Sequence, residues 1–148
     1  CSESGTVRLL SLSVTLTYQF FSNLTDRSLG HPTAIGICAD PIICTSFIAA
    51  LEAFEAAPAP DSVSMFGEIG GEDEEQAAKY IAENMDTPVA GFIAGRTAPP
   101  GKRMGHAGAI VSGSGTGTAD SKITALNDAG VPVADTPSEV AEAIDDFL

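Results

Sequence analysis

The stretch SVSMFGEIGGEDEEQAAKYIAENMDTPVAGF, residues 62–92, shows the expected fold class most clearly. It opens with an apolar run at Ser62–Phe66, continues with an amphipathic segment at Glu72–Glu83, and returns to an apolar run at Val89–Phe92. Two short apolar runs joined by a helix-length segment are typical of parallel strands connected by a crossover helix. The stretch therefore predicts one strand–helix–strand unit of an α/β sheet.

The same alternation extends in both directions along the chain, which we expect to form one domain over residues 1–148. Gly130 stands where a helix C-cap glycine is expected, and Thr136-Pro137 opens the last helix. The pattern predicts a flavodoxin-like, doubly wound sheet of about five parallel strands with helices on both faces, whose ligands bind at the carboxyl ends of the strands. The further strands are expected at Val7–Leu10, Ala34–Ile37 and Val131–Val133, and the further helices at Leu16–Leu24, Ile43–Ala56, Ala119–Ala129 and Ser138–Phe147.

The charge of the chain limits its partners. Seven Lys and Arg residues against 20 Asp and Glu residues give a net charge of −13. Such a surface repels nucleic acid and anionic lipid, so we expect neither as a partner. It fits a halophilic cytosolic protein and an ordinary acidic protein equally well. An odd count of three cysteines without a CxxC motif indicates thiols in a reducing cytoplasm.

A long connection after the fourth predicted strand carries the first candidate for chemistry. The segment GRTAPPGKRMGHAGAIVSGSGTGTAD, residues 95–120, is about 25 residues long, which is unusual in a compact domain and typical of a functional loop. It places His106 between Gly105 and Gly108, with Arg96, Lys102 and Arg103 nearby as cations for an anionic ligand. His106 is a candidate general base, metal ligand or nucleophile, or a residue that only stabilises its loop. No neighbouring residues have metal-ligand spacing, so we expect no metal.

A carboxylate and two helix starts complete the candidates. Glu68 follows the third predicted strand, where it either works with His106 by holding the Nδ1 proton or caps the next helix. The segments SLSVTLTY (11–18) and GSGTGTAD (113–120) precede predicted helices, whose N-termini favour anions. Neither segment is a Walker A loop. Flexible glycine in a surface turn is the commoner explanation of such segments.

Three segments together carry a resemblance to a known family: GEIGGEDEEQAAKYI, VAGFIAGRTAPPGKRMGHAGAIVSGSGTGTAD and ALNDAGVPV. They resemble the carboxyl-terminal ligase domain of the succinyl-CoA synthetase alpha subunit, an enzyme of the tricarboxylic acid cycle. The resemblance covers nearly the whole chain and is closest after about residue 61. GKRMGHAGAI (101–110) is its most specific motif.

The resemblance implies a phosphoryl-transfer role. His106 corresponds to the histidine that is phosphorylated, and Glu68 to the glutamate that pairs with it. Phosphate attacks the acyl-CoA thioester, the histidine accepts the phosphoryl group from the acyl phosphate, and its loop carries the group to an ADP or GDP on the beta subunit. CoA, phosphate and Mg-nucleotide are thus implied for the full complex, with no cofactor bound by this domain alone.

The resemblance also implies a phosphate site and further protein partners. Ser13, Val14 and Thr15 open the helix expected to hold the phosphohistidine, and Tyr18 matches a tyrosine near the substrate. The partners are a beta subunit and an amino-terminal CoA-binding domain of Rossmann type. This chain has no GxGxxG unit for the latter, so we expect no net turnover by the chain alone.

The sequence departs from the family in its first third. Val14 stands where the family has a glycine, and Cys38, Ala39 and Cys44 replace small or turn-forming residues. A valine at a turn that requires positive φ would be strained and would crowd a phosphate. A damaged site, a different local backbone and an error in this part of the sequence are the three interpretations.

Two alternatives to a working ligase domain follow. One is a catalytically inactive fragment that retains a subunit-interaction role. The other is a flavodoxin-like FMN protein, which the fold alone suggests.

Overall fold

The computed structural model describes residues 7–27, 33–37, 45–57, 62–99, 101–104, 108–111 and 117–147. These residues form one five-stranded sheet of order β2-β1-β3-β4-β5, in which every neighbouring pair is parallel. The predicted flavodoxin-like α/β fold is confirmed. The strands are β1 (Val7–Ser11), β2 (Thr33–Gly36), β3 (Ser62–Gly67), β4 (Val89–Ile93) and β5 (Val133–Ala134). The helices are α1 (Val14–Asp26), α2 (Phe47–Ala56), α3 (Asp73–Asn84), α4 (Ala119–Asp128) and α5 (Pro137–Asp145).

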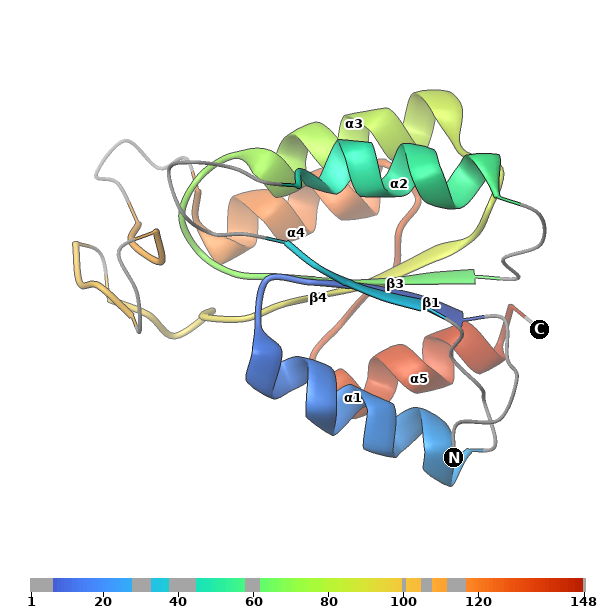
Figure 1. Ribbon diagram of the computed structural model, residues 1–148. Coiled ribbons are helices and arrows are strands. Elements are labelled where there is room, and N and C mark those ends of the chain that lie inside the picture. The colour runs from blue at the N-terminus through green and yellow to red at the C-terminus, as the bar shows by residue number, and fades with distance from the viewer. Residues whose placement is uncertain are drawn as a thin grey trace.

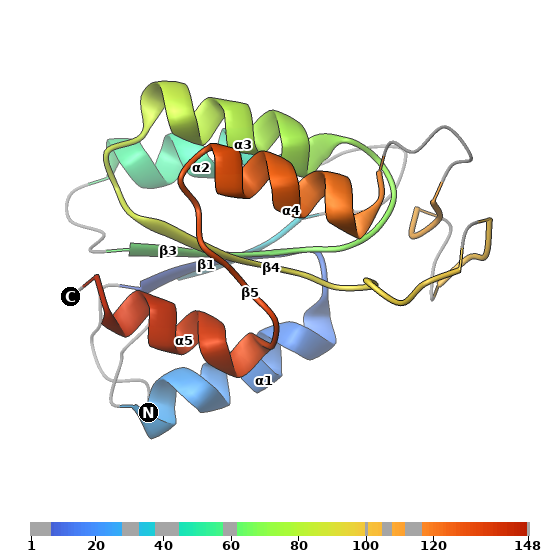
Figure 2. The same cartoon turned by 180° about the vertical axis from the view of Figure 1, so that it is seen from behind.

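Helices cover both faces of the sheet. Figure 1 shows α2, α3 and α4 on one side and α1 and α5 on the other, and Figure 2 shows the same layers from behind. Successive side chains of a strand alternate between the two cores: Leu10 and Met65 pack toward the three-helix layer, whereas Leu9 and Phe66 pack toward α1 and α5. The central strands are buried on both sides, as parallel sheets require.

Element boundaries differ from the prediction by one or two residues at most places, and two starts are set by specific contacts. The last strand begins at Val133 instead of Val131. The N–H groups of Gly130 and Val131 donate to carbonyls of α4 and complete the end of that helix. Pro132 has no N–H with which to bond a neighbouring strand. The second helix begins at Phe47, after Ser46 caps it by accepting from the Ala49 N–H at 3.2 Å. The predicted start at Ile43 lies outside the described residues.

The carboxyl ends of β1, β3 and β4 meet at one edge of the sheet, at the left in Figure 1. Ser11 pairs with Phe66, and the Leu12 N–H donates to the Phe66 carbonyl at 3.1 Å. On the other side of β3, the Ala94 N–H donates to the Gly67 carbonyl at 2.9 Å. The segments that follow these three strands therefore leave the sheet side by side.

No helix in the described ranges is both long and apolar enough to cross a membrane.

Candidate functional site

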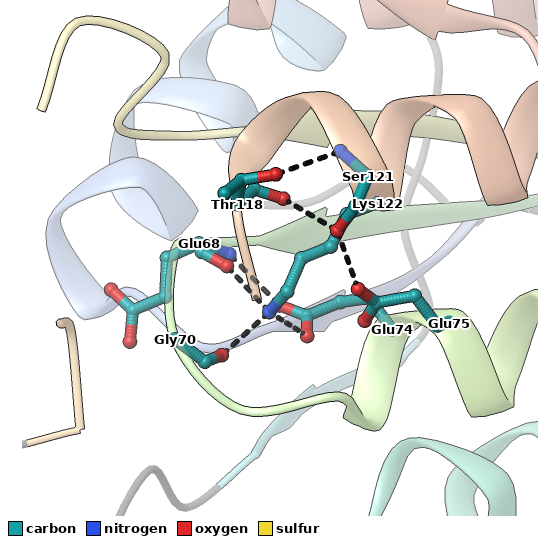
Figure 3. Close-up of polar contacts among 7 residues, drawn as sticks. All are labelled: Glu68, Gly70, Glu74, Glu75, Thr118, Ser121 and Lys122. Atoms are coloured by element: carbon teal, nitrogen blue, oxygen red, sulfur yellow. Dashed lines mark hydrogen bonds and ion pairs between the residues drawn. The ribbon is translucent and has the colours of Figure 1, made fainter. Parts of the chain in front are cut away.

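Glu68 is the first residue after β3, at the carboxyl edge where the sequence predicts it. Its backbone is held from both sides: the N–H donates to Oε1 of Glu74 at 3.0 Å, and the carbonyl accepts from Nζ of Lys122 at 2.8 Å. In Figure 3 the Glu68 carboxylate points away from Glu74 and Lys122. The backbone of Glu68 is thus anchored in the protein while its carboxylate is directed outward.

The anchor is a buried ion pair between Glu74 at the start of α3 and Lys122 in α4. The two side chains are 1% and 0% exposed. Nζ of Lys122 pairs with Oε2 of Glu74 and also donates to the carbonyls of Glu68 and Gly70, the latter at 2.6 Å. An ammonium group has three N–H donors, and these three acceptors use all of them.

Burial raises the pKa of the Glu74 carboxyl above its ordinary value. The charge and hydrogen bond of Lys122, and the hydrogen bond from the Glu68 N–H, act in the opposite direction by stabilising the carboxylate. The site therefore contains a charged pair whose desolvation is costly.

Sequence reasoning missed this pair, although a signal was present. In α4 the buried residues are Ala119, Lys122 and Leu126, so the lysine occupies the apolar stripe of its helix. In α3, Glu74 likewise shares a buried stripe with Ala77 and Ile81. A charged residue at an apolar position of each of two helices indicates a buried partner.

The turn that contains Glu68 packs against the loop that contains His106. The Gly70 N–H donates to the Gly117 carbonyl at 2.8 Å, and a Cβ at Gly70 would overlap the Gly108 carbonyl oxygen. Gly70 and Gly117 both have positive φ, +92° and +72°, so both depend on being glycine. The turn thus contacts the loop at two positions, both on the carboxyl side of His106.

His106 itself lies outside the described residues, as do Gly105 and residues 112–116. The chain on either side of it is described: the Met104 N–H donates to the Ala109 carbonyl at 2.9 Å, which joins the two ends of the segment that contains the histidine. The structure therefore brings Glu68 and the flanks of the His106 loop together without describing the histidine.

The candidate phosphate-binding residues stand at the start of α1. Ser13 is the N-cap residue, and its hydroxyl accepts from the Leu16 N–H at 3.4 Å. Val14 is the first residue of the helix. Helical backbone has negative φ, so the structure places Val14 outside the positive-φ turn in which a valine would be strained. Thr15 follows it in the same turn.

Tyr18 lies one turn further along α1 and is 72% exposed. It lines an apolar hollow of about 240 Å³ between α1 and the edge strand β2, with Phe21 and Ile35 among the other lining residues. None of the lining residues belongs to the turn that carries Glu68. This hollow therefore does not bring Tyr18 and Glu68 together.

The basic residues of the loop are divided. Arg96 forms an ion pair with Asp135, beyond β5, whereas Lys102 and Arg103 are exposed. Cys38, Ala39 and Cys44 lie outside the described residues. Among the residues that the structure describes, no three His, Cys, Asp or Glu side chains are placed to hold a metal ion.

The profile of the CoA-ligase family matches residues 10–132, which include both the Glu68 turn and the His106 loop. The chain belongs to the CoA-ligase family. The matched range runs from β1 to the residue before β5 and contains the whole carboxyl edge described above.

Curated relatives of this CoA-ligase domain are alpha subunits. The chain is 54% identical over 144 residues to the succinate–CoA ligase [ADP-forming] subunit alpha of Staphylococcus epidermidis, and the alignment covers 97% of this chain and 47% of the relative. The corresponding subunit of Staphylococcus aureus is 52% identical over 142 residues, with 96% and 47% covered. The chain spans about half the length of the curated relatives it matches.

Solved structures confirm the fold at lower identity. An ATP citrate lyase from Methanosaeta concilii, a D541A mutant in complex with (3S)-citryl-CoA, matches with a TM-score of 0.88 at 24% identity, over 99% of this chain and 25% of that one. A dinucleotide-forming acetyl-coenzyme A synthetase from Ca. Korarchaeum cryptofilum, in complex with phosphate and ADP, matches with a TM-score of 0.73 at 15% identity, over 97% and 30%.

Proposed function

We propose that this CoA-ligase domain carries a phosphoryl group on His106 as part of a succinate–CoA ligase. The observation that carries the proposal is the packing of the Glu68 turn against Gly108 and Gly117, two positions of the His106 loop that both follow the histidine in the chain. A carboxylate beside a histidine orients the ring through Nδ1–H and leaves Nε2 as the nucleophile. The high identity to succinate–CoA ligase alpha subunits supports the same assignment.

In the proposed reaction, inorganic phosphate displaces CoA from succinyl-CoA and gives succinyl phosphate. Nε2 of His106 then attacks the phosphorus, the bond from phosphorus to the carboxyl oxygen breaks, and succinate leaves. The phosphohistidine gives its phosphoryl group to a nucleoside diphosphate, for which the curated relatives indicate ADP. Glu68 stabilises the positive charge that the imidazole ring acquires during the attack.

We assign the phosphate site to the first turn of α1, at Ser13, Val14 and Thr15. The first backbone N–H groups of a helix lack intrahelical acceptors, and they favour an anion together with the helix dipole. Ser13 contributes by fixing this turn as its N-cap. Tyr18 is assigned to substrate binding on the same helix, where its exposed ring is available to an assembled complex.

The reaction needs parts that bind CoA and Mg-nucleotide. We therefore propose that the domain acts in the cytoplasm with a CoA-binding domain and a beta subunit, and that the Mg-nucleotide binds on the latter. The net charge of −13 makes nucleic acid and anionic membranes poor partners.

A pulse–chase experiment tests this function. The chain is assembled with a CoA-binding domain and a beta subunit of a succinate–CoA ligase and incubated with Mg²⁺ and ATP labelled in the γ-phosphate. We expect label on this chain, because the second half-reaction runs in reverse. Added ADP should return the label to ATP, and added succinate with CoA should release it as inorganic phosphate. An assembled complex whose chain takes up no label would contradict the proposal and favour a role in subunit interaction alone.

A further inference from the structure

The buried pair of Lys122 and Glu74 has no part in the chemistry proposed above. Two charges removed from water cost more free energy than apolar side chains of the same volume, so such a pair is weak evidence of stabilisation. Here two of the three Lys122 donors, and one of the two Glu74 oxygens, are used on the backbone of the turn 68–70. The contacts of the pair indicate that its role is to hold this turn.

We propose that Lys122 and Glu74 are positioning residues, which fix the Glu68 turn against the His106 loop so that phosphoryl transfer occurs without either residue touching the substrate. This inference rests on the proposed function of His106 and Glu68.

Contacts on both sides of the turn support a positioning role. On the inner side, Glu74 and Lys122 hold both the N–H and the carbonyl of Glu68, as well as the carbonyl of Gly70. On the outer side, Gly70 meets Gly108 and Gly117 of the loop. Figure 3 shows Nζ of Lys122 at the centre of this arrangement, with the Glu68 carboxylate directed away from it. A displacement of the inner contacts would therefore move the carboxylate relative to the loop.

The neighbouring backbone is shaped to fit the pair. A Cβ at Gly67 would lie 2.6 Å from Oε1 of Glu74 and 2.8 Å from its Cγ, so β3 must end in a glycine for the carboxylate to reach the Glu68 N–H. In α4, Ser121 beside Lys122 donates through its hydroxyl to Oε1 of Glu75 at 2.8 Å, which joins α3 and α4 a second time. The two helices are thus held at the spacing that the ion pair needs.

The test is the double variant Lys122→Met/Glu74→Met in the assembled complex. Methionine fills similar volume and leaves no unpaired charge, so we expect the variant to fold and assemble, with a melting temperature lowered by the loss of hydrogen bonds to the turn. The turn loses its three hydrogen bonds to these side chains, so we expect the single-turnover rate of His106 phosphorylation to fall on the order of 10- to 100-fold. The KM for nucleotide should stay unchanged, because the pair is proposed to act only on the transfer step.

A matched control is Arg27→Met/Glu142→Met, which removes an exposed ion pair between α1 and α5. We expect wild-type labelling from it. If the Lys122→Met/Glu74→Met variant folds and is phosphorylated at the wild-type rate, the inference is overturned. The ion pair of the wild type would then contribute to structure only. If wild-type chain takes up no label at all, the proposed function fails and the inference with it.

A second variant keeps the inference testable if the double variant does not assemble. Glu74→Gln has nearly the same shape, and its amide oxygen still accepts from the Glu68 N–H, but its NH2 group is a donor that faces the Lys122 ammonium and leaves that buried charge unpaired. We expect slower phosphorylation with an unchanged KM for nucleotide, by a smaller factor than in the double variant. Phosphorylation of Glu74→Gln at the wild-type rate would overturn the inference.

Discussion

The His106→Asn variant is expected to take up no phosphoryl group in the assembled complex, and to lose succinyl-CoA formation with it. Asparagine keeps a hydrogen-bond donor near the position of Nδ1, but its amide nitrogen is no nucleophile, so no covalent intermediate forms. The measurement is label on the chain after incubation with Mg²⁺ and γ-labelled ATP, with assembly checked by gel filtration.

The chain offers a matched control for this variant, because it has only two histidines. His31→Asn makes the same substitution at the other one and is expected to be labelled as the wild type is. Label that persists on His106→Asn and disappears from His31→Asn would move the phosphorylated residue to His31 and refute the assignment of Glu68 as its partner.

The Gly70→Ala variant is expected to disconnect the Glu68 turn from the His106 loop. Its φ of +92° is unfavourable for alanine, and the added Cβ would overlap the Gly108 carbonyl oxygen and lie 3.0 Å from the Ile110 nitrogen. We expect the free energy of unfolding to fall by about 2–4 kcal/mol, from left-handed backbone strain together with overpacking. Labelling of the assembled complex should fall as well, because Gly108 and the loop must move.

Gly71→Ala separates the two causes. Its φ is +65°, but a Cβ there would have nothing within 4 Å. We expect a loss of about 1 kcal/mol from the backbone alone and labelling close to that of the wild type. Denaturant unfolding and labelling of both variants make the comparison. Equal losses in the two variants would show that the contact with Gly108 does not matter for the site.

Much of the fold could be predicted because its signals are local. The apolar runs of β1, β3 and β4 are separated by amphipathic segments whose ends are marked by proline or glycine. The predicted ends of these three strands agree with the structure to within one residue. The last strand was predicted two residues too early, because β5 has only two residues and shows no pattern of its own, and because Val131 completes the end of α4. The strain considered at Val14 depends on a positive φ, whereas in the structure α1 begins at this residue, two residues earlier than its apolar pattern suggests.

The candidate site was predictable only in part. Glu68 could be placed from its position after an apolar run, and the long glycine-rich loop drew attention to His106, but the residues alone left the role of the histidine open. The resemblance supplied that role. Lys122 and Glu74 were missed because they are 48 residues apart, and their pairing depends on α3 and α4 lying side by side. Each residue alone resembles the many surface charges of an acidic chain.

We propose that His106, beside the Glu68 turn, carries the phosphoryl group, and this can be measured directly. The most direct measurement is the position of the phosphate on the wild-type chain, determined by fragmentation mass spectrometry under conditions that preserve phosphohistidine, after labelling in the assembled complex. We expect the phosphate on His106. Phosphate on any other residue of the chain, or a labelled complex whose phosphate lies on another subunit, would contradict it.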